Sequence, residues 1–214
     1  MQSVIQHRAS LFWGKVAFSM TCYFLLAVVS VHIIRTDLSI WKDAISRYAV
    51  GSFGLLVSSG LLAIGSAEVI TGFFHMRQST IRLPRTAGFV LLFCGLGICL
   101  AAFFPLDLDL SQRTLSGILH DCGALVQFGG FPVALFLWHA QIATSAHAAY
   151  TRLIAFITFI LGLAIGYMSL FATGHNYFGL IQKITVGLMV SWLGWQAYTL
   201  ASTGSAALPQ KEEV

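Results

Sequence analysis

Long apolar stretches with almost no charge are the feature that most constrains the fold of this chain. Six of them are long enough to cross a bilayer as helices, because one span needs about 20 apolar residues. They cover about residues 16–34, 49–74, 88–104, 115–138, 153–172 and 178–200. The predicted fold is therefore an all-α integral membrane bundle of six transmembrane helices, forming a single domain over residues 1–214.

The composition excludes several other classes of protein. Hydrophobic residues make up 57% of the 214 residues and charged residues only 9%, whereas soluble domains have about 45–50% and about 25%. Such a chain has too little charge to cover a surface exposed to water. Disordered chains, soluble enzymes and nucleic-acid-binding domains are excluded, so we expect the lipid bilayer as the surroundings and no nucleic-acid partner.

Basic residues at the ends of the spans predict how the bundle is oriented. Seven of the twelve Lys and Arg residues flank the side that carries the N-terminus, and five flank the other side. The excess is largest in the loop at residues 75–87, which holds three basic residues and no acid. Because cytoplasmic loops carry an excess of Lys and Arg, we expect both the N- and C-termini to be cytoplasmic.

Small residues at helical spacing predict how the spans pack, since they let helices approach closely in lipid. Trp192 and Trp195 lie off the small-residue stripe of the sixth span, so we expect them to face lipid or the membrane interface. The stripes are Gly51, Ser58, Gly65 and Gly72 in the second span, Gly162 and Gly166 in the fifth, and Gly187, Ser191 and Gly194 in the sixth.

In the fourth span, Pro132 is expected to bend the helix, and a broken helix of the transporter type is the alternative.

Polar residues are expected to gather at the outer ends of the spans. His120 and Asp121 lie near the start of the fourth span, and an ionisable residue within a span is a functional hypothesis because it is costly there. Asp109 and Gln112 are expected to form a capping box that starts this helix in the outer loop. If the group converges, it forms an outward-facing polar pocket; otherwise its members are separate caps and ion pairs. The other candidates for this pocket are Asp43, Ser46, Asp107, His175, Gln182 and Lys183.

Glu68 is a charged residue within the second span. It lies on the small-residue face, so we expect it to point into the bundle near the cytoplasmic end of the span. It either pairs with a basic residue of the following loop or carries a proton. The chain has no pair of histidines at the four-residue spacing typical of helical zinc sites, and we predict no metal and no cofactor.

Four short motifs lie near the ends of the spans: DAISRYAVG at residues 43–51, FPLD at 104–107, GILHD at 117–121 and GLIQK at 179–183. They resemble motifs of a prokaryotic membrane-protein family catalogued as a domain of unknown function, number 998. The resemblance implies a six-span topology in a prokaryotic cytoplasmic (inner) membrane, and it brings no activity. It gives weight to Asp43, Ser46, Pro105, Asp107, His120, Gln182 and Lys183, although Lys183 stands where arginine is common.

These observations leave three hypotheses for the function. The first is a membrane protein whose outward-facing pocket binds or transports a lipid headgroup or a small polar ligand, with a homodimer as a possible assembly. The second is a membrane-embedded hydrolase that uses His120 and Asp121. The third is a non-catalytic scaffold or a regulatory partner of another membrane protein. Convergence of the polar residues around a cavity would favour the first or second hypothesis over the third.

The predicted orientation can be tested by moving charge. Two lysines added beside Asp109 should perturb the topology, whereas two added beside Arg82 should not, because only the second site lies on the cytoplasmic side. Reporter fusions at both loops measure the outcome. An outward-facing signal from the Arg82 loop of the unmodified protein would refute the orientation.

Overall fold

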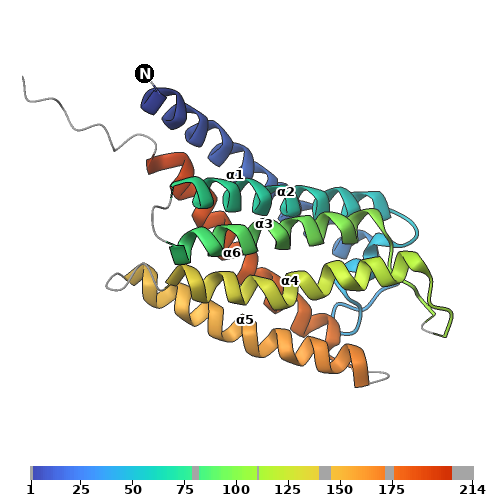
Figure 1. Ribbon diagram of the computed structural model, residues 1–214. Helices are drawn as coiled ribbons and strands as arrows, with labels where there is room; N and C mark the ends of the chain where they lie inside the picture. Colours follow the sequence, from blue (N-terminus) through green and yellow to red (C-terminus); the bar gives the residue numbers. More distant parts are fainter. Residues whose placement is uncertain (1, 79–81, 110, 140–145, 172–175, 204–214) are drawn as a thin grey trace, which may run out of the picture.

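The computed structural model describes residues 2–78, 82–109, 111–139, 146–171 and 176–203. These residues form α-helices and one short 3-10 helix, and none of them lies in a β-strand (Figure 1). The elements are α1 (Gln2–Ile34), η1 (Ile45–Ala49), α2 (Gly54–Gln78), α3 (Arg82–Phe103), α4 (Leu115–His139), α5 (Ala146–Phe171) and α6 (Phe178–Thr203).

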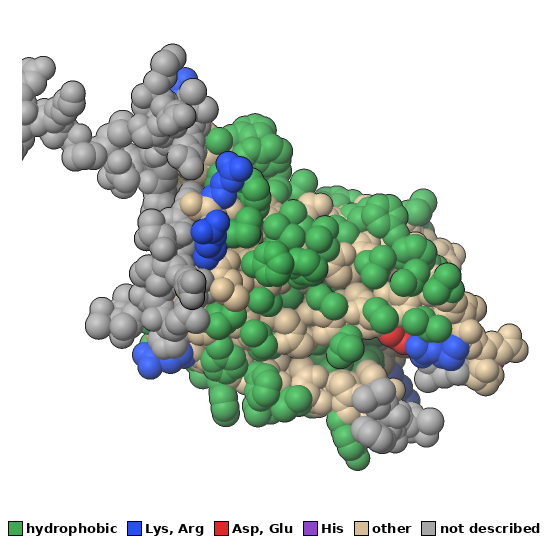
Figure 2. Space-filling view, viewed as in Figure 1, with side chains coloured by type: hydrophobic (Ala, Val, Ile, Leu, Met, Phe, Trp, Pro, Cys, Tyr) green, Lys and Arg blue, Asp and Glu red, His purple; other side chains and the backbone are tan. Residues whose placement is uncertain are grey.

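The six predicted membrane spans are confirmed as helices long and apolar enough to cross a bilayer. On the face in Figure 2, apolar side chains cover the middle of the molecule, and Lys and Arg side chains lie toward the ends of the helices. This distribution suits an integral, multi-pass membrane protein. The spans are Arg8–Ile34, Gly54–Arg77, Arg85–Phe103, Leu115–Trp138, Ala148–Ser169 and Phe178–Ser202.

The helices form a closed ring. Each helix packs against the next one along the chain, and α6 packs against α1. Helix α2 also contacts α6, and η1 contacts both of them. Helix α1 begins and α6 ends at the same end of the bundle (Figure 1). We call the opposite end, where η1 lies, the η1 end.

Helices α2 and α3 meet backbone to backbone at two levels. A Cβ added to Gly65 would lie 2.7 Å from the carbonyl oxygen of Gly95, and one added to Gly72 would lie 2.6 Å from that of Gly88. No larger residue fits at these contacts without moving a helix. Gly166 of α5, by contrast, has no neighbouring atom within 4 Å of such a Cβ.

Pro132 lies inside α4, which continues through it as one helix. Because proline has no N–H, the carbonyl of Phe128, four residues earlier, loses its helical donor. This oxygen faces α5, where a Cβ added to Gly162 would lie 2.8 Å from it. Gly162 therefore lets α5 approach the carbonyl that the proline leaves free.

The prediction for Trp192 is wrong. Its side chain is only 1% exposed, its ring packs edge-on against Phe131 with 5.7 Å between centroids, and Nε1 donates to Thr151 Oγ1 at 3.3 Å. Trp195 is 46% exposed, as expected. The error arises because α6 contacts α1, α2 and α5, so it buries more than the single face that a small-residue stripe marks.

Asp107 caps the start of α4. Its carboxylate accepts hydrogen bonds from the hydroxyl of Thr114 at 2.6 Å and from the backbone N–H of Thr114 at 2.8 Å, and these bonds lower the pKa of Asp107. The capping box predicted for Asp109 and Gln112 does not begin the helix, which starts at Leu115. Asp109 instead accepts from the backbone and hydroxyl of Ser111.

The glycine contacts between α2 and α3 predict a specific packing defect. Gly65→Ala should lower the stability of the bundle in detergent by about 1–3 kcal/mol, because the added methyl group overpacks the contact. Gly166→Ala is the matched control and should leave stability unchanged or slightly higher, since alanine favours helix. Thermal unfolding of both variants measures the difference. Equal melting temperatures would contradict the contact.

The cap formed by Asp107 predicts a sensitivity to acid. A carboxyl group whose pKa is lowered on folding stabilises the native state above its ordinary pKa, and this stabilisation is lost as the pH falls through the lowered value. Asp107→Asn keeps an acceptor but does not titrate. The variant should therefore lose less stability than the wild type between pH 6 and pH 3 (about one unit below the ordinary pKa of Asp). Melting temperatures measured across this range test it, and parallel curves would contradict it.

Candidate functional site

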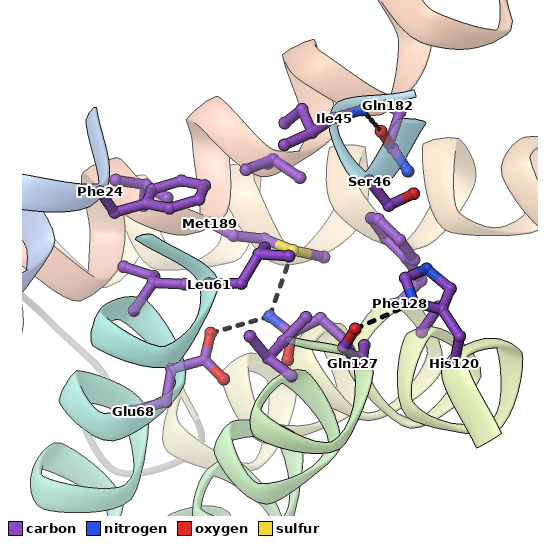
Figure 3. A pocket seen from close by; sticks show the side chains of 16 residues that line it. Phe24, Ile45, Ser46, Leu61, Glu68, His120, Gln127, Phe128, Gln182 and Met189 are labelled. Carbon is purple, nitrogen blue, oxygen red and sulfur yellow. Dashed lines mark hydrogen bonds between the residues drawn. The ribbon is translucent and has the colours of Figure 1, made fainter. Parts of the chain in front are cut away.

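A cavity, which we call the central cavity, lies inside the ring of helices (Figure 3). Its volume is about 70 Å³, and one water needs about 10–15 Å³ counted in the same way. The central cavity therefore has room for several waters or for a molecule of a few heavy atoms. Its lining comes from α1, η1, α2, α3, α4 and α6, namely Phe24, Ile45, Ser46, Leu61, Ile64, Glu68, Ile98, Ala101, His120, Ala124, Gln127, Phe128, Gln182, Val186, Met189 and Val190.

The walls of the central cavity are mostly apolar, with polar side chains on two sides. Glu68 and Gln127 meet on one side (Figure 3). Ser46, His120 and Gln182 lie toward the η1 end (Figure 3). An apolar space with a few convergent polar groups is the usual form of a site for a small molecule.

Glu68 and Gln127 form a buried polar pair, with exposed fractions of 2% and 5%. Gln127 Nε2 donates to Glu68 Oε1 at 2.7 Å and lies 3.9 Å from Met189 Sδ. The remaining oxygens, Glu68 Oε2 and Gln127 Oε1, have no hydrogen-bond partner among the described residues. Glu68 lies about 21 Å along α2 from Gly54, at ~1.5 Å per residue. It is therefore near the middle of the span. The sequence had suggested a position near the C-terminal end of this span.

His120 joins the end of α3 to α4 and also lines the cavity. Its side chain is 6% exposed, and Nδ1 lies 3.0 Å from the carbonyl oxygen of Ala101 and 2.9 Å from that of Phe104. Carbonyls at the end of a helix lack intrahelical donors, and they can only accept, so Nδ1 carries the hydrogen. In the neutral ring, Nε2 is then an acceptor.

Gln182 and Lys183 hold η1 and the preceding residues over the cavity. Gln182 Oε1 accepts from the backbone N–H of Ile45 at 2.7 Å. Lys183 Nζ donates to the carbonyl oxygens of Ile40 at 3.0 Å and Asp43 at 2.5 Å. The ammonium group of Lys183 therefore binds the backbone of the covering segment.

The segment at residues 35–53 covers the η1 end of the bundle. Tyr48 is fully buried, which raises the pKa of its phenol, and its ring stacks on His32 with 4.3 Å between centroids. Arg35 donates to the carbonyl oxygens of Val50 and Ser52. Between these two residues, Gly51 has a φ of 86°, a left-handed conformation that favours glycine.

Four of the predicted polar residues lie outside the cavity lining. Asp121 forms an ion pair with Arg113 at 2.6 Å, and its side chain is 53% exposed. Its neighbour His120 points into the bundle, so the pair does not converge on one partner. Asp43 accepts from the backbone N–H of Ser39 at 2.7 Å. The other two are Asp107, which caps α4, and Lys183, which binds the covering segment; His175 is outside the described residues.

The structure brings together Glu68 and three members of the predicted pocket, Ser46, His120 and Gln182. Sequence reasoning missed Gln127, which completes the polar pair. The available signal was its position seven residues after His120, because that spacing places two residues on the same face of a helix. Among the described residues, no three His, Cys, Asp or Glu side chains are grouped as a metal site would require.

Searches of curated proteins and of solved structures found no significant match. The sequence model of one family, described as "Protein of unknown function (DUF998)", matches residues 21–199. The match includes every residue that lines the central cavity, from Phe24 to Val190. The chain therefore belongs to the DUF998 family of proteins of unknown function.

Proposed function

We propose that this protein binds a small molecule inside the membrane, in the central cavity, and carries it across the bilayer. The observation that carries the proposal is a pair of buried, unpartnered polar oxygens, Glu68 Oε2 and Gln127 Oε1, on two residues that line an internal space. The ligand is a molecule of a few heavy atoms, with one polar group and an apolar remainder that suits the walls.

The energetics of burial support a ligand-binding role over a purely structural one. A buried polar atom without a partner costs about 1–3 kcal/mol, and a carboxyl group within a bilayer is costly as well. A scaffold would gain stability from leucine at both positions. Glu68 and Gln127 are therefore best explained by a partner that the cavity takes up.

The size of the central cavity supports a small ligand over a lipid headgroup. With a volume of about 70 Å³, it accepts a molecule of a few heavy atoms in the present conformation. The hydrolase hypothesis has less support, because the carboxylate of Asp121 is paired with Arg113 and lies outside the lining.

We propose further that the ligand enters from the η1 end, which faces outward if the termini are cytoplasmic. Two polar anchors hold η1 and the preceding residues over the cavity: the Gln182 bond to Ile45 and the Lys183 bonds to Ile40 and Asp43. The Lys183 bonds are exposed or partly buried, so water can replace them. Release of this segment is the simplest route to the cavity.

The proposal predicts that filling the cavity abolishes binding of a small probe. Ethanol is a suitable probe, and with three heavy atoms its Kd cannot be much tighter than about 1 mM. Ala124→Phe places a ring in the cavity and should weaken ethanol binding at least tenfold. Saturation-transfer NMR on the purified protein in detergent measures the binding.

Leu125→Phe is the matched control, since Leu125 is on the same helix and 72% exposed. It should bind ethanol as the wild type does, and empty micelles give the background. Equal signals from the two variants would show that the probe contacts only the lipid-facing surface. The scaffold hypothesis would then be favoured.

A further inference from the structure

The unpartnered polar atoms of Glu68 and Gln127 are both hydrogen-bond acceptors. The amide nitrogen of Gln127 already donates to Glu68 Oε1 and faces Met189 Sδ. What remains unpartnered is Glu68 Oε2 and Gln127 Oε1, and both oxygens offer only lone pairs. A ligand that satisfies this side must therefore bring hydrogen-bond donors.

Among the described residues that line the central cavity, none is a lysine or an arginine. The ionisable groups that interact with Glu68 from α3 are the thiols of Cys94 and Cys99, which supply no positive charge. His120 of α4 lies across the cavity (Figure 3), and Lys183 is bound to backbone carbonyls. An ionised Glu68 therefore needs a cation from outside the chain, because an uncompensated carboxylate in low dielectric is strongly destabilised.

We infer that the central cavity binds a small primary ammonium ion, with Glu68 as its counter-ion and Gln127 Oε1 as its second acceptor. This inference rests on the proposed function and names its ligand class. An ammonium group has three N–H donors and no acceptor, which complements the two free oxygens. The third N–H faces the cavity, where water fits, and a short alkyl chain lies against Leu61, Ile64 and Met189.

Other cations fit the observations less well. A divalent metal ion takes about six or more oxygen ligands, and this side of the cavity offers two free oxygens. A proton bound to Glu68 would turn Oε2 into a donor, but it would leave the rest of the cavity without an occupant. An alkylammonium ion uses the acceptors, the charge and the apolar walls together.

The test compares ethylammonium with ethanol, which has the same number of heavy atoms and no charge. Ethylammonium should bind the wild type at least tenfold more tightly than ethanol does, measured by the same NMR titration in detergent. Glu68→Gln keeps the size of the side chain and removes its charge, so it should weaken ethylammonium binding at least tenfold. The ratio of ethylammonium affinity to ethanol affinity should therefore fall at least tenfold in this variant.

Asp121→Asn is the matched control, because its carboxylate is paired with Arg113 at the surface, and it should bind both probes as the wild type does. A second comparison uses the wild-type protein and tetramethylammonium. This cation has the charge but no N–H, and it should bind at least tenfold more weakly than ethylammonium. Equal binding of these two cations to the wild type would overturn the inference.

The possible failures can be told apart. If ethanol binds in a manner that Ala124→Phe blocks but ethylammonium does not bind, the ammonium inference is wrong and the proposed function stands with a neutral ligand. If Glu68→Gln binds ethylammonium like the wild type, Glu68 is not the counter-ion and the inference is overturned. If neither probe binds in the cavity, the proposed function and the inference both fail.

Discussion

The position of the candidate site depends on the close approach of α2 and α3. Where Gly65 meets Gly95, no side chain separates the two backbones, and a Cβ on Gly95 would lie 2.9 Å from the Cβ of Glu68. Glu68 is one helical turn from Gly65, on the same side of α2. The glycine contact therefore places this carboxyl group in the interior of the ring. Lipid cannot reach it there, and water can reach it only through the cavity.

The central cavity and its cover belong to one arrangement. Apolar residues of α2, α3, α4 and α6 build the walls, and the polar pair of Glu68 and Gln127 keeps one side from being purely apolar. At the η1 end, Gln182 and Lys183 use side-chain groups to hold the backbone of the covering segment. Residues that the sequence grouped as one polar set thus have different roles. Some line the cavity or anchor its cover, whereas Asp107 caps α4 and Asp121 pairs with Arg113.

Much of the fold could be predicted from the sequence, because the length of an apolar run and the thickness of a bilayer are directly comparable. The site was only partly predictable. Helical spacing correctly placed Glu68 inside the bundle, but it could not show that His120 turns inward while its neighbour Asp121 turns toward Arg113. The inward direction of Trp192 was missed for the same reason, since the burial of a helix face depends on which neighbours pack against it.

The sequence by itself determined the six spans, the all-helical class and the small residues that allow close helix packing, since each follows from local composition and spacing. Only the tertiary structure decided that α6 closes the ring on α1 and that Gln127 pairs with Glu68. The physical reason is that these contacts join residues far apart in the chain. Glu68 and Gln127 lie on different helices, and their meeting depends on the order and rotation of the packed helices, which no local pattern in the sequence records.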